Sequence, residues 1–327
     1  MRQNEYIFNS SAKLSIVLPA FNEERRLPPL LDALCAINHD PKDIELIVVD
    51  DGSTDGTSLI CQQIINDFFP NGKVITKPKN TGKGSALRTG VAAANAPIII
   101  TMDADMATDL SAMEPAIKGL QTHHIVVGSR SIEGSQTQGI TSTRRFVTIG
   151  FSFLLRLLTR HRISDTQCGF KAYKSPVAKI LFSSSRVKGF AQDAEILDLA
   201  YRHNFSILEI PVRWTSIPGS KVNLIRDSIS SFLEFIRYRL STGKTKRIDG
   251  LSILDNESEE GIVESEILRF FPPGNIYIRC QSTTDIMMPE VGRDEIKKIA
   301  KAFHRKYPDW ETCICSRTLS DLSSIKY

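Results

Sequence analysis

Several common signatures are missing from this 327-residue chain, and each absence narrows the classes of protein to which it can belong. No run of 18 apolar residues occurs and residues 1–11 lack a signal-peptide core, so we expect no membrane-spanning helix and no export signal. The six cysteines show neither zinc-binding spacing nor a secreted disulfide framework, which favours a reducing compartment. A net charge of +4 is too small to indicate a nucleic-acid partner, and none is expected.

Two familiar nucleotide-binding motifs are also absent. No G-x-G-x-x-G follows a strand-like segment, which argues against a dinucleotide-binding fold. Gly82, Lys83 and Gly84 open a helix-like segment, but position 77 is Lys and Ser85 does not follow Lys83 directly, so this is not a P-loop. Glycines at a helix N-terminus still suit a phosphate, with Lys83 as the countercharge.

Residues 13 to 128 alternate between strand-like and helix-like segments. The expected strands are Leu14–Leu18, Glu45–Asp50, Lys73–Thr76, Ile98–Asp103 and His124–Gly128, and the expected helices are 25–37, 57–68, 84–95 and 110–121. This order predicts an α/β fold with a mostly parallel sheet and helices on both faces.

The rest of the chain is expected to divide into three parts. Further helices are expected at 144–160, 190–203 and 223–240, and short strands at 168–173 and 206–214. We expect one domain over 1–245, a polar linker over 246–262, and a small C-terminal α/β appendage over 263–327. The appendage reads strand 276–280, helix 293–306 and strand 312–316.

The segment Ile98–Asp105 reads as a buried strand that ends in two carboxylates one residue apart. Ligands bind at the carboxyl ends of the strands in open α/β sheets. Alternation along the strand aims Asp103 and Asp105 to the same side, where they could hold a divalent cation whose shell a diphosphate completes. A solvated strand end explains a lone D-x-D equally well, so the metal interpretation depends on the neighbouring segments.

Two other expected strands also end in polar residues. After the first, Asn22 and Glu23 could contact a base or ribose, or Asn22 could be the N-cap of the next helix. After the second, Asp50 and Asp51 could accept hydrogen bonds from a uracil and a ribose, or form a plain Asp-Gly turn. Two such ends on neighbouring strands favour a nucleotide pocket.

Together these segments resemble the family 2 glycosyltransferases, which have a GT-A fold. Downstream segments occur in the order seen in the dolichyl-phosphate β-glucosyltransferases of that family and their polyprenyl-phosphate relatives. They are VGSR at 127–130, ISDTQCGFK at 163–171, DAE at 193–195, ILEIPVRW at 207–214 and IPGSK at 217–221. The resemblance covers about residues 13–240, and DTQCGFK is its most specific element.

The resemblance implies roles for particular residues. It implies that the nucleotide sugar is bound by Pro19, Asn22, Glu23, Asp50, Asp51, Lys83 and Asp103. Asp105, together with Asp103, would ligate Mg²⁺ or Mn²⁺. Donor or acceptor phosphates would face Arg130, Arg144, Arg145 and Lys221, because a guanidinium fork matches phosphate oxygens.

Asp193 is the candidate catalytic base, on an expected helix with Glu195 nearby, and Arg130 is the second candidate catalytic residue. Asp193 and Glu195 could instead be solvated helix acids. A phosphate acceptor is already anionic at neutral pH, so a strong base is not required and Asp193 could orient the sugar or the acceptor.

The chain departs from the family pattern in three places. The N-terminal membrane anchor expected of these relatives is missing, Gln192 stands where an apolar residue is usual, and 241–327 matches no known pattern.

Two segments could place the protein on a membrane surface. Residues 145–159 and 223–240 carry apolar side chains at helical spacing with basic residues around them, which suits a helix lying in the membrane plane. Such stripes more often pack against a sheet. If they bind lipid, the protein is cytoplasmic and peripheral on the cytosolic face of a membrane.

The sequence therefore predicts an inverting, metal-dependent glycosyltransferase that moves a hexose, most simply glucose, from UDP to a polyprenyl or dolichyl phosphate. A family 2 transferase with a soluble sugar or glycan acceptor is the first alternative. A non-catalytic module that binds nucleotide sugars is the second.

Overall fold

The computed structural model describes most of the chain. The described residues are 5–7, 11–37, 39–139, 163–218, 224–241, 247–254, 276–280, 283–288, 293–306 and 312–318. Three predicted site residues, Arg144, Arg145 and Lys221, lie outside these ranges, as does the expected helix 144–160.

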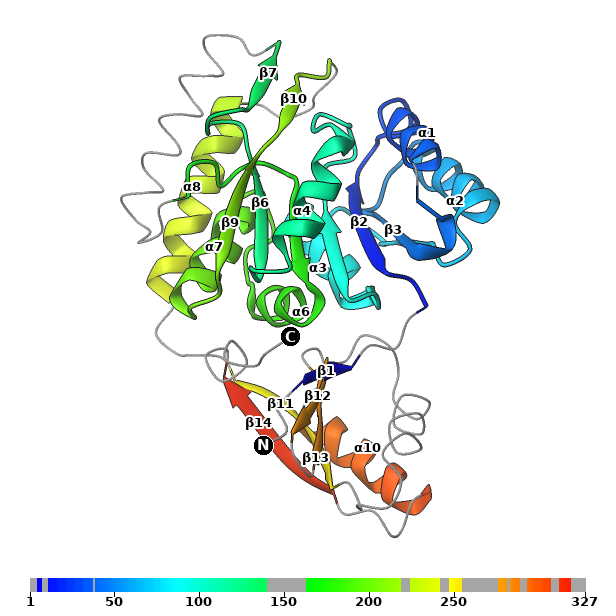
Figure 1. The fold of residues 1–327 in the computed structure, drawn as a ribbon, viewed down its shortest axis with the longest axis vertical. Coiled ribbons are helices and arrows are strands. Elements are labelled where there is room, and N and C mark those ends of the chain that lie inside the picture. The colour runs from blue at the N-terminus through cyan, green and yellow to red at the C-terminus, as the bar shows by residue number, and fades with distance from the viewer. Residues whose placement is uncertain are drawn as a thin grey trace.

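The larger part of the structure is built on a seven-stranded sheet with the strand order β4-β3-β2-β5-β8-β6-β9 (Figure 1). Its strands are β2 (Leu14–Ala20), β3 (Ile44–Asp50), β4 (Lys73–Thr76), β5 (Ile98–Thr101), β6 (Ile125–Ser129), β8 (Lys171–Lys174) and β9 (Ile207–Pro211). All neighbouring pairs are parallel except the two made by β8, which runs antiparallel to β5 and β6. The sheet is therefore mostly parallel, as expected, with one reversed strand inside it.

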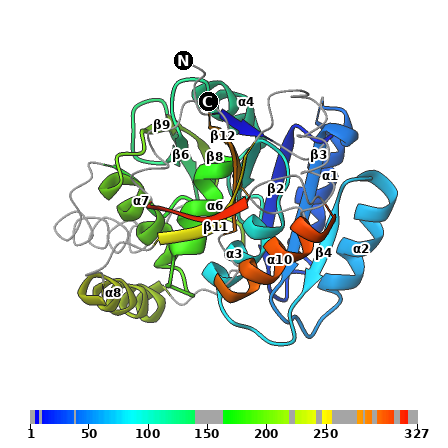
Figure 2. The same cartoon turned by 90° about the horizontal axis from the view of Figure 1, so that it is seen from below.

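Helices cover both faces of this sheet. They are α1 (Pro28–Ala36), α2 (Thr57–Phe68), α3 (Lys83–Ala93), α4 (Met113–Gly119), α6 (Ser175–Ser184), α7 (Gln192–Arg202) and α8 (Leu224–Ser241). Two short 3-10 helices, η1 (Pro41–Asp43) and η2 (Leu110–Ala112), precede β3 and α4. Figure 2 shows the arrangement from below, with α2 and α8 on opposite sides of the molecule.

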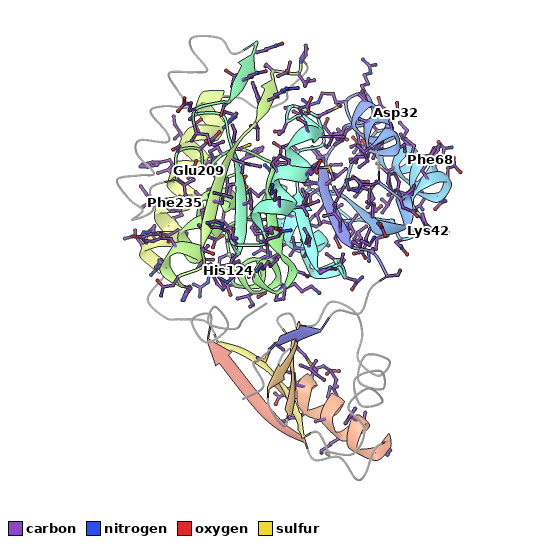
Figure 3. All side chains as sticks on the ribbon, viewed as in Figure 1. Asp32, Lys42, Phe68, His124, Glu209 and Phe235 are labelled. Carbon is purple, nitrogen blue, oxygen red and sulfur yellow. The ribbon has the colours of Figure 1, made fainter. Side chains whose placement is uncertain are left out.

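Alternating side chains of the strands form two separate cores. Ile16 and Leu18 of β2 pack with residues of α1, α2 and α4 on one face, whereas Val17 packs with residues of α3, α6, α7 and α8 on the other. Figure 3 shows side chains filling the space between the sheet and the helices on both sides. Each fully buried Leu, Ile or Val contributes roughly 1.5–3 kcal/mol relative to exposure, so this pattern holds the strand ends in place.

Helix α6 was not expected from the sequence. All ten of its residues are buried, so its sequence shows no polar face and lacks the amphipathic pattern by which a surface helix is recognised.

The small sheet is antiparallel, with the strand order β1-β12-β13-β11-β14, and is accompanied by helix α10. Its elements are β1 (Glu5–Ile7), β11 (Arg247–Leu254), β12 (Ile276–Cys280), β13 (Thr283–Met287), α10 (Arg293–Lys306) and β14 (Thr312–Thr318). Two of these strands lie outside the expected appendage: β1 is near the N-terminus, and β11 falls within the expected linker. Sequence spacing could not reveal this, because long-range strand pairing joins segments that are distant along the chain.

A two-stranded parallel sheet completes the fold. β7 (Gln136–Gln138) pairs with β10 (Arg213–Thr215), and Trp214 of β10 also bridges to Thr108. This pairing brings the loop after β6 and the end of β9 to the loop that follows β5.

Candidate active site

The carboxyl ends of β2, β3 and β5 meet at one edge of the large sheet. Ala20 is in register with Asp50, and the Asp51 amide donates to the Ala20 carbonyl at 2.8 Å. The Met102 amide donates to the carbonyl of Val17 at 3.3 Å. The acidic residues that follow these strands therefore occupy neighbouring loops, as expected for a site at the strand ends.

Asn22 anchors the loop after β2 to the loop after β3. It has a φ of 54°, its side-chain oxygen accepts from the Thr54 amide at 2.8 Å, and its own amide donates to the Ser53 hydroxyl at 2.8 Å. Helix α1 begins at Pro28, with Leu27 at the N-cap position. The alternative interpretation of Asn22 as a helix cap is therefore wrong.

Asp50 and Asp51 are both buried, and both bond to backbone amides. Asp50 accepts from the amide of Ser53 at 2.9 Å. Asp51 accepts from the amides of Thr81 and Gly82 at 2.9 and 2.7 Å and lies 2.9 Å from the Lys77 ammonium. Asp51 thus shapes the loop before α3, and two amides expected to cradle a phosphate already have a carboxylate partner.

Lys83 connects the end of β5 with α7. Its ammonium lies 2.8 Å from Asp103 and 3.2 Å from Asp193, two residues whose loop and helix are far apart in the chain. Burial alone would lower the pKa of Lys83, but the two carboxylates outweigh it and raise that pKa above its usual value. Lys83 is therefore a permanent cation between the candidate donor-binding and catalytic acids.

Asp193 is held by a second, fully buried lysine. Lys171 is 0% exposed, and its ammonium lies 2.5 Å from Asp193 and 2.5 Å from the Cys168 carbonyl. Burial would raise the pKa of Asp193, yet Lys171 and Lys83 together lower it. The carboxylate is ionised but strongly paired, which makes it a weak base and a well-oriented hydrogen-bond acceptor.

The Asp103 carboxylate packs directly against the backbone of Gly169. A Cβ atom added at Gly169 would lie 2.1 Å from an Asp103 oxygen, which no real contact allows. A glycine at this position of the DTQCGFK run therefore permits the observed position of Asp103.

Asp105 faces Arg26 on the other side of the loop. The Arg26 guanidinium lies 3.5 Å from Asp105 and also pairs with both oxygens of Glu23, at 2.5 and 2.7 Å. Burial and the nearby charge of Asp103 raise the pKa of Asp105. Two carboxylates that repel each other in this way fit a divalent cation, which would relieve the repulsion. Within the described ranges, no group of three or more His, Cys, Asp or Glu residues is placed to hold a metal.

Arg130 is held in place by Asp165 and Trp214. Its guanidinium bonds both oxygens of Asp165 at 2.6 and 2.8 Å and lies 5.5 Å from the centre of the Trp214 ring. These contacts use two of its five N–H donors, and a phosphate-facing Arg130 stays a prediction. Asp165 belongs to the DTQCGFK run, but nothing in that run indicated which cation it would bind.

Glu195 is buried and holds the segment before α7 through hydrogen bonds. It is 0% exposed and accepts from the Ser185 hydroxyl and from the amides of Arg186 and Val187 at 2.7 to 3.0 Å. Because Asp193 is also buried, the alternative of two solvated helix acids is wrong for both.

Gln192, the departure from the family pattern, donates to the carbonyl of Gly84 at 2.9 Å and so joins α7 to α3.

A mostly parallel sheet with acidic loops at its carboxyl edge, one of them a D-x-D pair, defines a glycosyltransferase of the GT-A type. The chain belongs to the family described as "Glycosyl transferase family 2", whose sequence profile matches residues 15–182. It is therefore a glycosyltransferase.

Similar proteins of known name support this assignment. The chain is 38% identical to the human dolichyl-phosphate beta-glucosyltransferase over 258 residues, which span 72% of this chain and 79% of the human protein. It is 36% identical over 230 residues to a dolichyl-phosphate beta-glucosyltransferase of Trichomonas vaginalis, covering 66% of this chain and 67% of that protein.

Solved structures show the same fold. Glucosyl-3-phosphoglycerate synthase from Mycobacterium tuberculosis in complex with UDP superposes with a TM-score of 0.52 at 20% identity, over 72% of this chain and 84% of that one. The same protein in complex with Mn²⁺ and UDP-glucose gives a TM-score of 0.53 at 18% identity, over 73% and 83%.

Proposed function

We propose that this glycosyltransferase transfers glucose from UDP-glucose to dolichyl phosphate or a related polyprenyl phosphate, with inversion at the anomeric carbon. The observation that carries the proposal is the single edge at which Asp103, Asp105, Lys83 and Asp193 meet, in a chain 38% identical to a dolichyl-phosphate beta-glucosyltransferase. The acceptor phosphate oxygen forms a bond to the anomeric carbon as the bond to UDP breaks, and UDP leaves with the electron pair.

The donor is proposed to lie across the loops that follow β2, β3 and β5. Pro19, Asn22 and Glu23 would border the nucleotide on one side, and Asp50 and Asp51 on the other. The contacts of Asn22 and Asp51 support this placement, because they join the loop after β3 to the loop after β2 and to the loop before α3. Lys83 would offer its charge to the diphosphate while remaining paired with Asp193.

Asp193 is proposed to orient the substrate rather than to remove a proton. Its lowered pKa and its two lysine partners support an acceptor of hydrogen bonds from sugar hydroxyls. An anionic phosphate acceptor needs no deprotonation, so the reaction does not require Asp193 to be a strong base.

Mg²⁺ or Mn²⁺ is proposed as the cofactor, held by Asp103 and Asp105. Carboxylate oxygens are the ligands such hard cations prefer, and the diphosphate and water would complete the shell. When bound, the ion would neutralise charge that develops on the leaving diphosphate.

A transfer assay tests the proposed function. The purified chain, UDP-[¹⁴C]glucose, Mn²⁺ and dolichyl phosphate should give a radioactive lipid that extracts into organic solvent. Release of UDP with a labelled soluble glycan as the only product would identify the soluble-acceptor alternative. Binding of UDP-glucose without any turnover would identify a non-catalytic module.

We further propose that the protein is cytoplasmic and reaches its lipid acceptor by lying on the membrane surface through α8. Phe235 and Tyr238 of α8 are buried toward α7, whereas Ile229, Leu233 and Leu240 are 57%, 48% and 84% exposed along its outer side. Exposed apolar residues at this spacing with a cationic neighbour, Arg237, suit an in-plane helix on anionic lipid. Within the described ranges, no helix is long and apolar enough to span a bilayer.

Replacing Ile229, Leu233 and Leu240 together by Ser should weaken binding to anionic vesicles by roughly tenfold or more, because three apolar side chains no longer enter the lipid. Vesicle flotation measures this effect. Leu59→Ser on α2 is the matched control, since Leu59 is 66% exposed on another face. Equal flotation of the triple variant and the unchanged protein would contradict the role of α8.

The proposed division of the chain keeps one glycosyltransferase domain and one small appendage. The strand pairings support an appendage that includes β1 and β11 in addition to the elements after residue 263.

A further inference from the structure

A cavity of about 570 Å³ opens beside Asp105 and is separate from the residues assigned to the nucleotide. It lies between the start of α1, the loop after β5 and the β7–β10 pair. Of the residues proposed to bind the donor, none lines it. Asp105, a proposed cation ligand, lines the cavity and also borders the proposed donor site. A group bound here would therefore sit next to the diphosphate end of the donor, not next to its base.

Three arginines line this cavity, and two of them form no ion pair with any residue in the described part of the chain. Arg26 is committed to Glu23 and Asp105. Arg25 and Arg213 are exposed into the cavity, and neither side chain makes a hydrogen bond or ion pair with any residue in the described part of the chain. Asp109, the second acid of the lining, accepts from the Ser111 amide; hydrogen bonding from Ser111 and, less strongly, the charge of Arg213 lower its pKa.

Three other cations at this edge of the sheet are paired with carboxylates of the protein. Arg130 pairs with Asp165, Lys83 with Asp103 and Asp193, and Lys171 with Asp193. Arg25 and Arg213 line the cavity and have no ion-pair partner in the described part of the chain, so they are available to an anion there. Two guanidinium forks across a cavity match the oxygens of a phosphate.

The rest of the lining is part polar, with Gln136, Gln138 and Thr215, and part apolar. Met106, Trp214, Ile217 and Pro218 form the apolar part together with Pro29. A ligand with a phosphate at one end and a hydrocarbon chain behind it can contact both the arginines and the apolar part of the lining.

We infer that this cavity binds the phosphate of the acceptor between Arg25 and Arg213, with the first isoprene unit against Met106 and Trp214. The inference rests on the proposed transfer to a polyprenyl phosphate. It adds two positioning residues that sequence reasoning did not single out.

Calorimetry with citronellyl phosphate, a short isoprenyl phosphate, in the presence of UDP and Mn²⁺ tests this inference. The double variant Arg25→Leu/Arg213→Leu should bind the probe roughly 100-fold more weakly, about tenfold for each charged contact, while its affinity for UDP changes less than twofold. Arg213→Lys should retain part of the affinity because the charge remains. Lys118→Leu, which removes an exposed cation on α4, should change neither affinity.

Three results would overturn the inference. They are unchanged probe binding by the double variant, an equal loss of UDP affinity, which would place the donor diphosphate in the cavity, and binding of inorganic phosphate as tight as that of the probe. The proposed function is tested separately by glucose transfer to dolichyl phosphate in the unchanged protein. A protein that transfers glucose but whose variants bind the probe normally contradicts the cavity assignment alone.

Discussion

Asp105→Asn should reduce glucose transfer by at least roughly 100-fold, because the proposed cation site loses half of its protein charge and the leaving diphosphate loses its electrostatic support. The fold should remain intact. The substituted amide oxygen can still accept from the Ala107 amide, the contact that Asp105 makes at 3.1 Å, and Arg26 retains both of its bonds to Glu23.

Turnover of UDP-glucose as a function of Mn²⁺ concentration, together with Mn²⁺ binding followed by electron paramagnetic resonance, measures the effect. Asp40→Asn is a matched control, because Asp40 accepts from the amide two residues ahead at 2.9 Å in the same way but lies in the loop before η1. Near-normal turnover of Asp105→Asn with an unchanged Mn²⁺ dependence would refute the metal role.

Asp193→Ala should abolish most turnover and also lower the free energy of unfolding by about 3–5 kcal/mol. The physical reason is Lys171, which is 0% exposed and would be left buried without its carboxylate partner. Urea unfolding monitored by circular dichroism measures the stability, and the lipid-product assay measures the turnover.

The double variant Lys171→Met/Asp193→Leu separates the structural effect from the catalytic one. Removing both charges of a buried pair is far less costly than removing one, so this variant should recover much of the lost stability. Its turnover should remain low, because no carboxylate orients the substrate. Recovery of turnover along with stability would show that Asp193 only neutralises Lys171.

Much of the large sheet was predictable from local patterns. The strands β2 to β6 and helices α1 to α4 were expected within a few residues of their observed bounds, because parallel strands buried on both faces read as apolar runs between amphipathic helices. The position of β8 was expected, but its antiparallel direction was not, since direction depends on the connection and leaves no mark in a four-residue strand.

The small sheet shows the limit of that reasoning. β11 lies in a stretch that reads as a polar linker, and β1 is only three residues long, so neither has a period that distinguishes it from a loop. Pairing with β12, β13 and β14 makes them strands.

Local order along the chain was sufficient to place acids at neighbouring strand ends, because a parallel sheet brings the carboxyl ends of its strands to one edge. Which cation meets which acid depended on contacts between distant segments. Lys83 and Asp193 are 110 positions apart, and Arg26 and Asp105 are 79 apart. Such pairs form because strand order and helix packing bring their elements together, and no short-range pattern carries that information. For the same reason, the sequence did not indicate that Arg25 and Arg213 line one cavity.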